Sequence, residues 1–124
     1  MLDIQSIDVN IGATPILRGV TLEVPSGSMC GLIGRNGAGK TTFMRAVMGA
    51  LQSKTGGIDF DGQNLRDAPA YRRAHIGIGF MPEDRRLVPQ LTAEENILLP
   101  TWTIDIEGAE DRLFWIYKLM PEVE

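Results

Sequence analysis

The sequence predicts an α/β fold on the strength of three observations. Two stretches near the N-terminus alternate apolar and polar residues, as half-buried antiparallel strands do. A short apolar run at residues 28–33 leads into a glycine-rich loop and then into a segment with helical periodicity. A third apolar run, at residues 76–80, indicates one more buried strand. With 124 residues, the chain has room for one domain.

Alternation in residues 7–11 and again in residues 20–24 predicts two N-terminal strands that pair antiparallel. Leu2 and Ile4 lie on the opposite parity from the apolar residues of 7–11. A bulge near Gln5 would bring both sets to one face, because it adds one residue to the strand.

The glycine-rich loop fits the pattern G-x-x-x-x-G-K-[ST], the P-loop or Walker A motif. Backbone N–H groups that converge on a concave nest hold phosphate oxygens, and glycines keep such a nest open. Lys40 is placed to reach the β- and γ-phosphates, and the Thr41 hydroxyl to ligate Mg²⁺. Because the strand and helix around it agree with the motif, a chance glycine-rich turn is disfavoured. The predicted nucleotide-binding residues are Gly34, Arg35, Asn36, Gly37, Ala38, Gly39, Lys40, Thr41 and Thr42.

The segment after the loop, residues 42–51, repeats apolar residues at four-residue spacing and is expected to be a helix. Residues 58–60 form a short strand, which the turn dipeptide Asp61-Gly62 follows. Asp67 is placed to cap a short helix through Arg72.

The last third of the chain is predicted to be helical after a polar loop at residues 81–86. Thr92 and Glu95 form a capping box that opens a helix through Leu99. Residues 107–120 carry apolar residues on one face, and Pro121 ends that helix.

Composition is that of a soluble globular protein, with 44% hydrophobic and 23% charged residues. The net charge of −4 argues against nucleic acid as a partner. The single cysteine, Cys30, excludes an intrachain disulfide and is expected to be a small buried residue of the strand at 28–33. We find neither a signal peptide nor an apolar run of membrane-spanning length, so a cytoplasmic location is expected.

In the order of these elements, the chain resembles the N-terminal half of an ATP-binding subunit of the ABC transporter family. The resemblance extends over essentially the whole chain. Residues 78–86 and 91–96 resemble the subunits that serve importers of branched-chain and other hydrophobic amino acids. The resemblance implies a partial P-loop NTPase core with an N-terminal antiparallel β-subdomain. It also implies ATP and Mg²⁺ as ligands, membrane-spanning permease subunits as partners, and a peripheral place at the inner face of the cell membrane.

Two further site residues follow from the resemblance. Glu83 stands where the family has its Q-loop glutamine, a residue near Mg²⁺, and joins Thr41 as an expected metal ligand. A solvated loop carboxylate is the alternative for Glu83. Ile11 falls where the family has an aromatic residue that stacks on adenine. An aliphatic side chain can pack on the ring, although it lacks the π-face with which an aromatic residue stacks on a base.

The family also has a Ser-Gly-Gly signature, a Walker B strand and a switch histidine, which we do not find in these 124 residues. His75 is instead interpreted as a surface or strand-edge residue. The expectation is a truncated nucleotide-binding domain over residues 1–124, with no catalytic residue assigned and negligible ATP hydrolysis by the chain alone. Bare edges at residues 29–33 and 76–80 favour a homo-oligomer.

Two other functions stay open from the sequence. One is another P-loop NTPase such as a GTPase, because residues 59–62 match D-x-x-G, although no Asn-Lys-x-Asp motif follows. The other is a remnant that binds nucleotide without hydrolysing it, or that assembles with itself.

Overall fold

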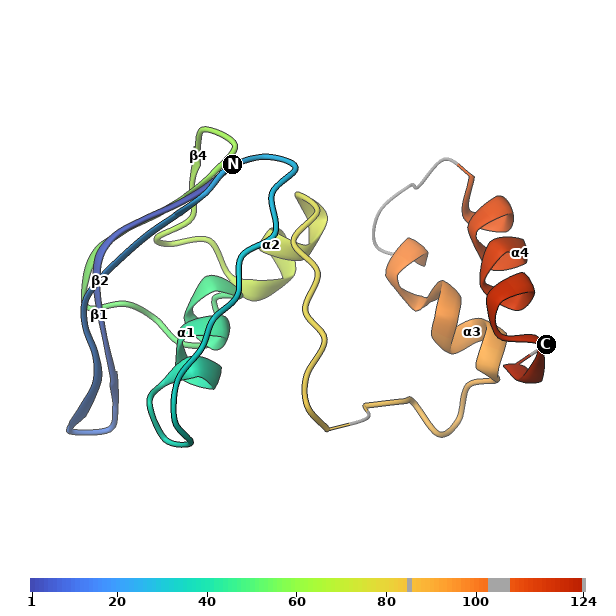
Figure 1. Cartoon of the computed structure of the whole chain (residues 1–124), viewed down its shortest axis with the longest axis horizontal. Helices are drawn as coiled ribbons and strands as arrows, with labels where there is room; N and C mark the ends of the chain where they lie inside the picture. Colours follow the sequence, from blue (N-terminus) through green and yellow to red (C-terminus); the bar gives the residue numbers. More distant parts are fainter. Residues whose placement is uncertain (85, 103–107, 124) are drawn as a thin grey trace. The chain divides into compact units, whose positions relative to one another are not determined.

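The computed structural model describes residues 1–84, 86–102 and 108–123, and the chain forms two compact units, Met1–Ile78 and Gly79–Glu124 (Figure 1). The first unit contains β1 (Leu2–Ile11), β2 (Thr14–Val24), α1 (Lys40–Val47), β3 (Thr55–Phe60), β4 (Gln63–Asn64) and α2 (Ala70–His75). The second contains α3 (Ala93–Leu98), the 3-10 turn η1 (Leu99–Trp102), α4 (Ala109–Leu119) and the 3-10 turn η2 (Pro121–Val123).

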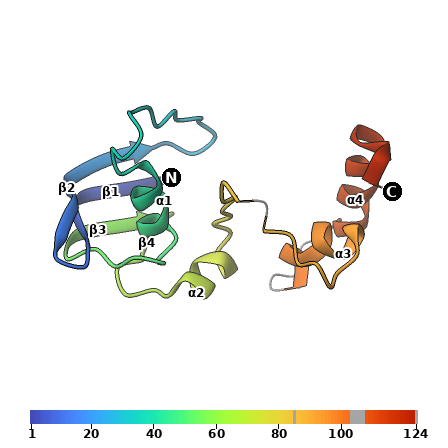
Figure 2. The same ribbon diagram turned by 90° about the horizontal axis from the view of Figure 1, so that it is seen from below.

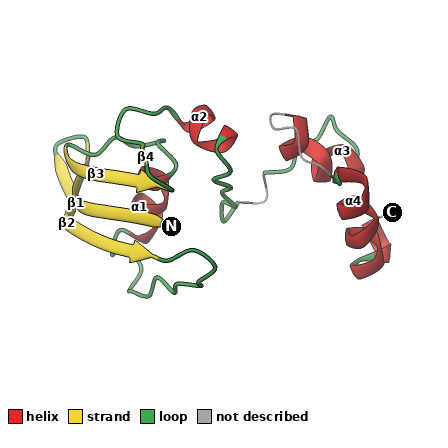
Figure 3. Cartoon of the chain, turned by 90° about the horizontal axis from the view of Figure 1, so that it is seen from above, coloured by secondary structure: helices red, strands yellow, loops and turns green. Residues whose placement is uncertain are grey.

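In the described residues, the first unit holds one sheet with the strand order β2-β1-β3-β4, in which every pair is antiparallel (Figure 3). The predicted pairing of the two N-terminal strands is confirmed, with Ile4 opposite Leu22. Helix α1 lies along one face of this sheet (Figure 2). The buried core joins the sheet to the helix and consists of Ile4, Ile7, Val9, Leu17, Phe43, Ala46, Val47, Ile58 and Leu65.

The predicted bulge in β1 is confirmed. The register of β1 against β2 shifts between Ile4 and Ile7, and Ser6 has a φ of 47°. The Ser6 N–H donates to the hydroxyl of Thr21 at 3.0 Å instead of joining the regular ladder. Ile4 and Ile7 are therefore both fully buried on the same face, as the sequence pattern requires.

Gly56 in β3 passes close to this bulge. It has a φ of +78°, and a Cβ at this position would overlap the carbonyl oxygen of Gln5 and lie 2.5 Å from that of Ser6. Because both obstacles are backbone atoms, they cannot be displaced by a change of rotamer. The pairing of β3 with the bulged part of β1 therefore requires glycine here.

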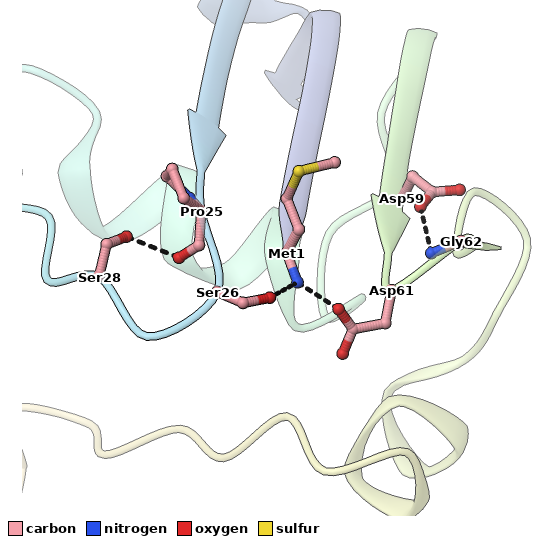
Figure 4. Close-up of polar contacts among 7 residues, drawn as sticks. All are labelled: Met1, Pro25, Ser26, Ser28, Asp59, Asp61 and Gly62. Atoms are coloured by element: carbon pink, nitrogen blue, oxygen red, sulfur yellow. Dashed lines mark hydrogen bonds and ion pairs between the residues drawn. The ribbon is translucent and has the colours of Figure 1, made fainter.

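The turn between β3 and β4 is formed by Asp61 and Gly62, as predicted. Their φ angles are 49° and 79°, which is the left-handed pair typical of a two-residue hairpin turn. Asp59 accepts the Gly62 N–H at 2.9 Å, and the Met1 ammonium forms an ion pair with Asp61 (Figure 4). The same ammonium donates to the Ser26 hydroxyl at 2.8 Å, so the two turns at this end of the sheet are tied together.

Asp8 joins three strands of the sheet. Its carboxylate accepts the Thr55 hydroxyl at 2.5 Å and the Gly19 N–H at 2.7 Å. These two hydrogen bonds, that from Thr55 first, lower the pKa of Asp8 below its ordinary value.

We expect Asp8→Asn to lower the unfolding midpoint near neutral pH and to lose that effect in acid. A carboxyl whose pKa is lower in the folded state adds stability above its unfolded pKa, and that stability disappears as the pH falls through the folded value. Thermal unfolding of both proteins from about pH 7 to about pH 2 checks this. A difference between the two that stays constant over this range would contradict the assigned role of the carboxylate.

The buried strand predicted at residues 28–33 is wrong. These residues belong to no strand, and Met29 and Ile33 are 100% and 95% exposed. Cys30 is exposed as well, against the expectation of a buried thiol. Apolar sequence favours a strand only where a neighbour pairs with its backbone groups, and no described segment pairs here.

Three smaller predictions are corrected in the same unit. Residues 76–80 form no strand, although Ile76 and Ile78 pack against the core. Helix α1 ends at Val47 instead of continuing to residue 51, because Gly49 turns the chain with a φ of +73°. Asp67 does not cap α2, whose N-cap is Pro69 without a side-chain hydrogen bond.

The predicted capping box is confirmed at the start of α3 in the second unit. Thr92 accepts the Glu95 N–H at 3.2 Å, and Glu95 accepts the Thr92 N–H at 2.8 Å. Asn96 then donates to the carbonyl oxygens of Val88, Leu91 and Thr92 and so holds the preceding loop against α3. The Tyr117 hydroxyl donates to Glu94 at 3.1 Å and links α4 to α3.

The last predicted helix corresponds to α4, which ends at Leu119 shortly before Pro121. Its predicted first residue, Glu107, lies outside the described residues. None of the helices in the described ranges has the length and hydrophobicity that a membrane span requires.

Candidate functional site

The predicted phosphate loop leads directly into α1. Gly37 and Gly39 have φ angles of 82° and 96°, and Gly39 is the N-cap of the helix. The Ala38 N–H donates to the Arg35 carbonyl at 3.1 Å and closes a turn within the loop. The two glycines thus supply the left-handed backbone that a concave nest of N–H groups needs. The positive end of the α1 dipole lies at the same place.

Lys40 lies at the first position of α1 and folds back over the loop. Its ammonium donates to the carbonyl oxygens of Gly34 at 2.7 Å and Arg35 at 2.9 Å. A full positive charge is therefore held beside the N-terminus of the helix, and the loop is curled around it. A cation and a helix N-terminus at one place make a site for an anion.

The strand β2 supports the loop from below. A Cβ on Gly39 would lie 2.9 Å from the Leu17 side chain and 3.2 Å from that of Ile16. This close approach and the φ of 96° both favour glycine at this position. Gly34 is the first glycine of the motif. A Cβ at this position would lie 3.4 Å from the Ala38 Cβ and 4.0 Å from the Lys40 side chain.

The two threonines after Lys40 differ in exposure. The Thr41 side chain is exposed at the first turn of α1, where a hydroxyl can ligate a metal ion bound to phosphate. Thr42 is 8% exposed and anchors the helix next to Phe43 in the core. Of these two predicted residues, only Thr41 presents a side chain to solvent. Arg35, Asn36 and Gly37 are exposed in the loop.

The two remaining predicted site residues, Ile11 and Glu83, lie outside the loop at residues 34–42. Ile11 ends β1, is 50% exposed and pairs with Thr14. Glu83 is exposed in the loop at the start of the second unit. In the described residues, no group of three or more His, Cys, Asp or Glu side chains is placed to hold a metal ion. A hydroxyl such as that of Thr41 together with phosphate oxygens is a donor set that suits Mg²⁺.

The match of residues 59–62 to D-x-x-G has a structural explanation. Asp59 accepts the Gly62 N–H and Gly62 supplies a positive φ, so both residues serve the hairpin turn. This is the position at which the sequence predicts a hairpin.

Among the described residues, one buried charged residue is absent from the sequence predictions. Arg73 on α2 is only 3% exposed, and its guanidinium contacts the end of α1. Arg72 beside it is exposed. Two adjacent arginines in a short helix give no signal as to which of them is buried.

Comparison with known proteins gives a match over most of the chain. The model of the family described as ABC transporter matches residues 17–124. A probable ABC transporter ATP-binding protein of Azorhizobium caulinodans is 40% identical over 86 residues, which are 69% of this chain and 31% of that protein. The high-affinity branched-chain amino acid transport ATP-binding protein BraG of Pseudomonas aeruginosa is 30% identical over the whole chain and 53% of its own length. The chain thus spans at most about half of these relatives.

A solved structure titled as the ATP-binding subunit of an ABC transporter is similar with a TM-score of 0.77 at 32% identity, covering 89% of this chain and 45% of that one. A dimeric ATP-binding cassette, solved in a post-hydrolysis state with ADP and Pi, gives a TM-score of 0.79 at 23% identity, covering 95% and 56%. The second likeness shows the fold alone. Both agree with the predicted partial P-loop NTPase fold.

Proposed function

Since the chain belongs to the ABC transporter family, we propose that residues 34–42 bind the phosphates of ATP together with Mg²⁺. The observation that carries the proposal is the Lys40 ammonium held beside the N-terminus of α1, over a loop with two left-handed glycines. Positive charge and the N-terminus of a helix at one place suit the triphosphate.

Each residue has a separate role in this proposal. The backbone N–H groups of the loop hold the β-phosphate, and Gly37 and Gly39 give the nest its curvature. Lys40 exchanges its two carbonyl partners for β- and γ-phosphate oxygens. Mg²⁺, when bound, neutralises phosphate charge, and Thr41 supplies one protein ligand to it. Ile11 is proposed as an apolar contact for the base, and the role of Glu83 near the metal, which the resemblance implies, stays a prediction.

Calorimetric titration of the 124-residue chain with MgATP and with MgGTP tests this function. We expect saturable binding of MgATP and a turnover close to zero in the same sample, because hydrolysis needs groups that position water beyond the P-loop. Failure to bind MgATP would refute the proposal. Preference for MgGTP would favour the GTPase alternative, and turnover at the rate of an intact transporter ATPase would contradict the expected dependence on further residues.

We extend the proposal to the whole protein of which this chain resembles half. It is the energy-coupling subunit of a branched-chain amino acid importer, bound to permease subunits at the cytoplasmic face of the membrane. Two matches over nearly the full chain, in Pseudomonas aeruginosa and Archaeoglobus fulgidus, support the amino acid solute. Other relatives are named for lipoprotein release, lipopolysaccharide export and Fe(3+) import. The iron-import relative is 36% identical over 98% of this chain, so coverage alone does not select the solute. Uptake of labelled leucine by cells with and without the gene decides whether this solute is correct.

Self-association of the chain is part of the same proposal. Residues 28–33 belong to no strand and expose the apolar side chains of Met29 and Ile33. In the described residues their backbone groups have no ladder partner, so a strand of another chain can pair with them. Light scattering coupled to size-exclusion chromatography is expected to show an oligomer. A monomer that melts cooperatively at high concentration would contradict it.

A further inference from the structure

Arg73 is buried, yet its guanidinium is well supplied with hydrogen-bond acceptors. Nε donates to the Ala68 carbonyl at 2.9 Å. Nη1 donates to the carbonyls of Ala46 at 2.9 Å and Val47 at 2.6 Å. Nη2 donates to the Leu65 carbonyl at 2.5 Å. One side chain thus joins the end of α1 to two points of the segment that leads into α2.

The end of α1 is electrostatically suited to this cation. Ala46 and Val47 are in the last turn of the helix, where the carbonyl groups carry the negative end of the dipole. The Ala46 carbonyl also accepts the Gly49 N–H at 3.0 Å. These carbonyls compensate the buried charge. Burial still lowers the pKa of the Arg73 guanidinium below its ordinary value.

The backbone around α1 is shaped to admit the guanidinium. Gly49, which terminates the helix, would with a Cβ approach Arg73 Nε to 2.7 Å and Cζ to 3.0 Å. The φ of +73° at Gly49 and the missing side chain together let the planar group lie against the backbone.

The other contacts of α1 hold it less specifically. Phe43, Ala46 and Val47 join the helix to the sheet through apolar packing, which is not directional. The hydrogen bonds of a guanidinium are directional and charge-assisted. They therefore fix the axial position and the tilt of a helix that is only eight residues long. At a helical rise of 1.5 Å per residue, its phosphate end is about 12 Å from its C-terminal end.

We infer that Arg73 is a positioning residue for the phosphate site, which it controls from the opposite end of α1. The inference rests on the proposed function, because it takes residues 34–42 to be where phosphate binds. Without the guanidinium, the Val47 carbonyl loses its partner and α1 can tilt on its apolar face. A displacement of about 1 Å at Gly39 and Lys40 is enough to misalign the nest.

Arg73→Met tests this inference, with Arg73→Lys as the conservative variant and Arg72→Met as the matched control. Arg72 lies next to Arg73 on α2 and is exposed, so its replacement removes the same charge without touching α1. Affinity for MgATP is measured by calorimetry well below the unfolding midpoint of every variant, so that only folded protein is titrated. We expect a loss of about tenfold for Arg73→Met, a smaller loss for Arg73→Lys, and a change of less than about twofold for Arg72→Met.

The outcomes separate positioning from stability alone. Folded Arg73→Met with wild-type affinity would overturn the inference, even if its midpoint is lower. If Arg73→Met does not fold, Arg73→Lys and Gly49→Ala carry the test, because the added Cβ displaces the guanidinium without removing it. Wild-type affinity in both would overturn the inference as well. A wild-type chain that binds no MgATP would refute the proposed function and the inference with it, whereas unchanged variants of a binding wild type refute only the inference.

Discussion

Replacing Gly56 by alanine is expected to lower the free energy of unfolding by about 2–6 kcal/mol, or to prevent folding. The new Cβ would overlap the Gln5 carbonyl oxygen and lie 2.5 Å from that of Ser6, and the residue would keep a φ of +78°. This range is the sum of two costs, about 1–3 kcal/mol for a non-glycine residue in left-handed backbone and about 1–3 kcal/mol for overpacking. To relieve this clash, β3 has to move away from β1, and this movement opens the core at Ile58.

Gly57→Ala is the matched control for this substitution. Gly57 also lies in β3, but a Cβ there meets nothing within 4 Å. Denaturant unfolding of the wild type and both variants gives the comparison, and Gly57→Ala is expected to stay within about 1 kcal/mol of the wild type. Equal stability of the two variants would mean that the backbone at the Ser6 bulge moves to accept a Cβ at position 56. It would contradict the conclusion that the pairing of β3 with β1 requires glycine there.

Replacing Lys40 by alanine is expected to reduce the affinity for MgATP by about tenfold or more. A charge-assisted contact to phosphate contributes roughly 1.5–3 kcal/mol, and the ammonium lies beside the helix N-terminus where that contact would form. Titration calorimetry measures the effect directly. Lys54→Ala, a lysine-to-alanine change at an exposed loop position, serves as the control and should leave the affinity unchanged.

Lys40 also ties the loop together through Gly34 and Arg35, so its removal has a second consequence. The unfolding midpoint of the nucleotide-free variant shows how far the loop depends on these bonds. If a folded Lys40→Ala protein binds MgATP with unchanged affinity, Lys40 does not contact the phosphates. The assignment of residues 34–42 as the phosphate site would then lose the observation on which it mainly rests.

The sequence predicts the N-terminal sheet well because its signals are local. Alternation sets the faces of β1 and β2, the change of parity after Ile4 locates the bulge, and Asp61-Gly62 marks the hairpin. The strand prediction for residues 28–33 is wrong because a strand needs a neighbouring strand to pair with, and the apolar run itself does not show whether such a neighbour is present. Their composition is that of a buried strand, but their exposure in the structure is nearly complete at Met29 and Ile33.

In the candidate site, too, the local features are predictable from the sequence and the contacts between distant segments are not. The motif predicts the loop, its left-handed glycines and the lysine at the start of α1, since these follow from the spacing of residues within one segment. Arg73 could not be found in this way, because its partners on α1 are 26 and 27 residues away in the sequence. Gly49, the glycine that admits it, has the ordinary signature of a helix terminator.

The most direct test of nucleotide binding at residues 34–42 is an NMR titration of the labelled chain with MgATP. Binding at this site predicts saturable shifts of the backbone amides of Gly37, Gly39, Lys40 and Thr41, with one common affinity. In Lys40→Ala, the shifts of the loop amides are expected to need about tenfold more MgATP to reach the same extent. Saturable shifts confined to other parts of the chain, such as the Asp59–Gly62 turn, or no saturable shifts at all, would contradict it.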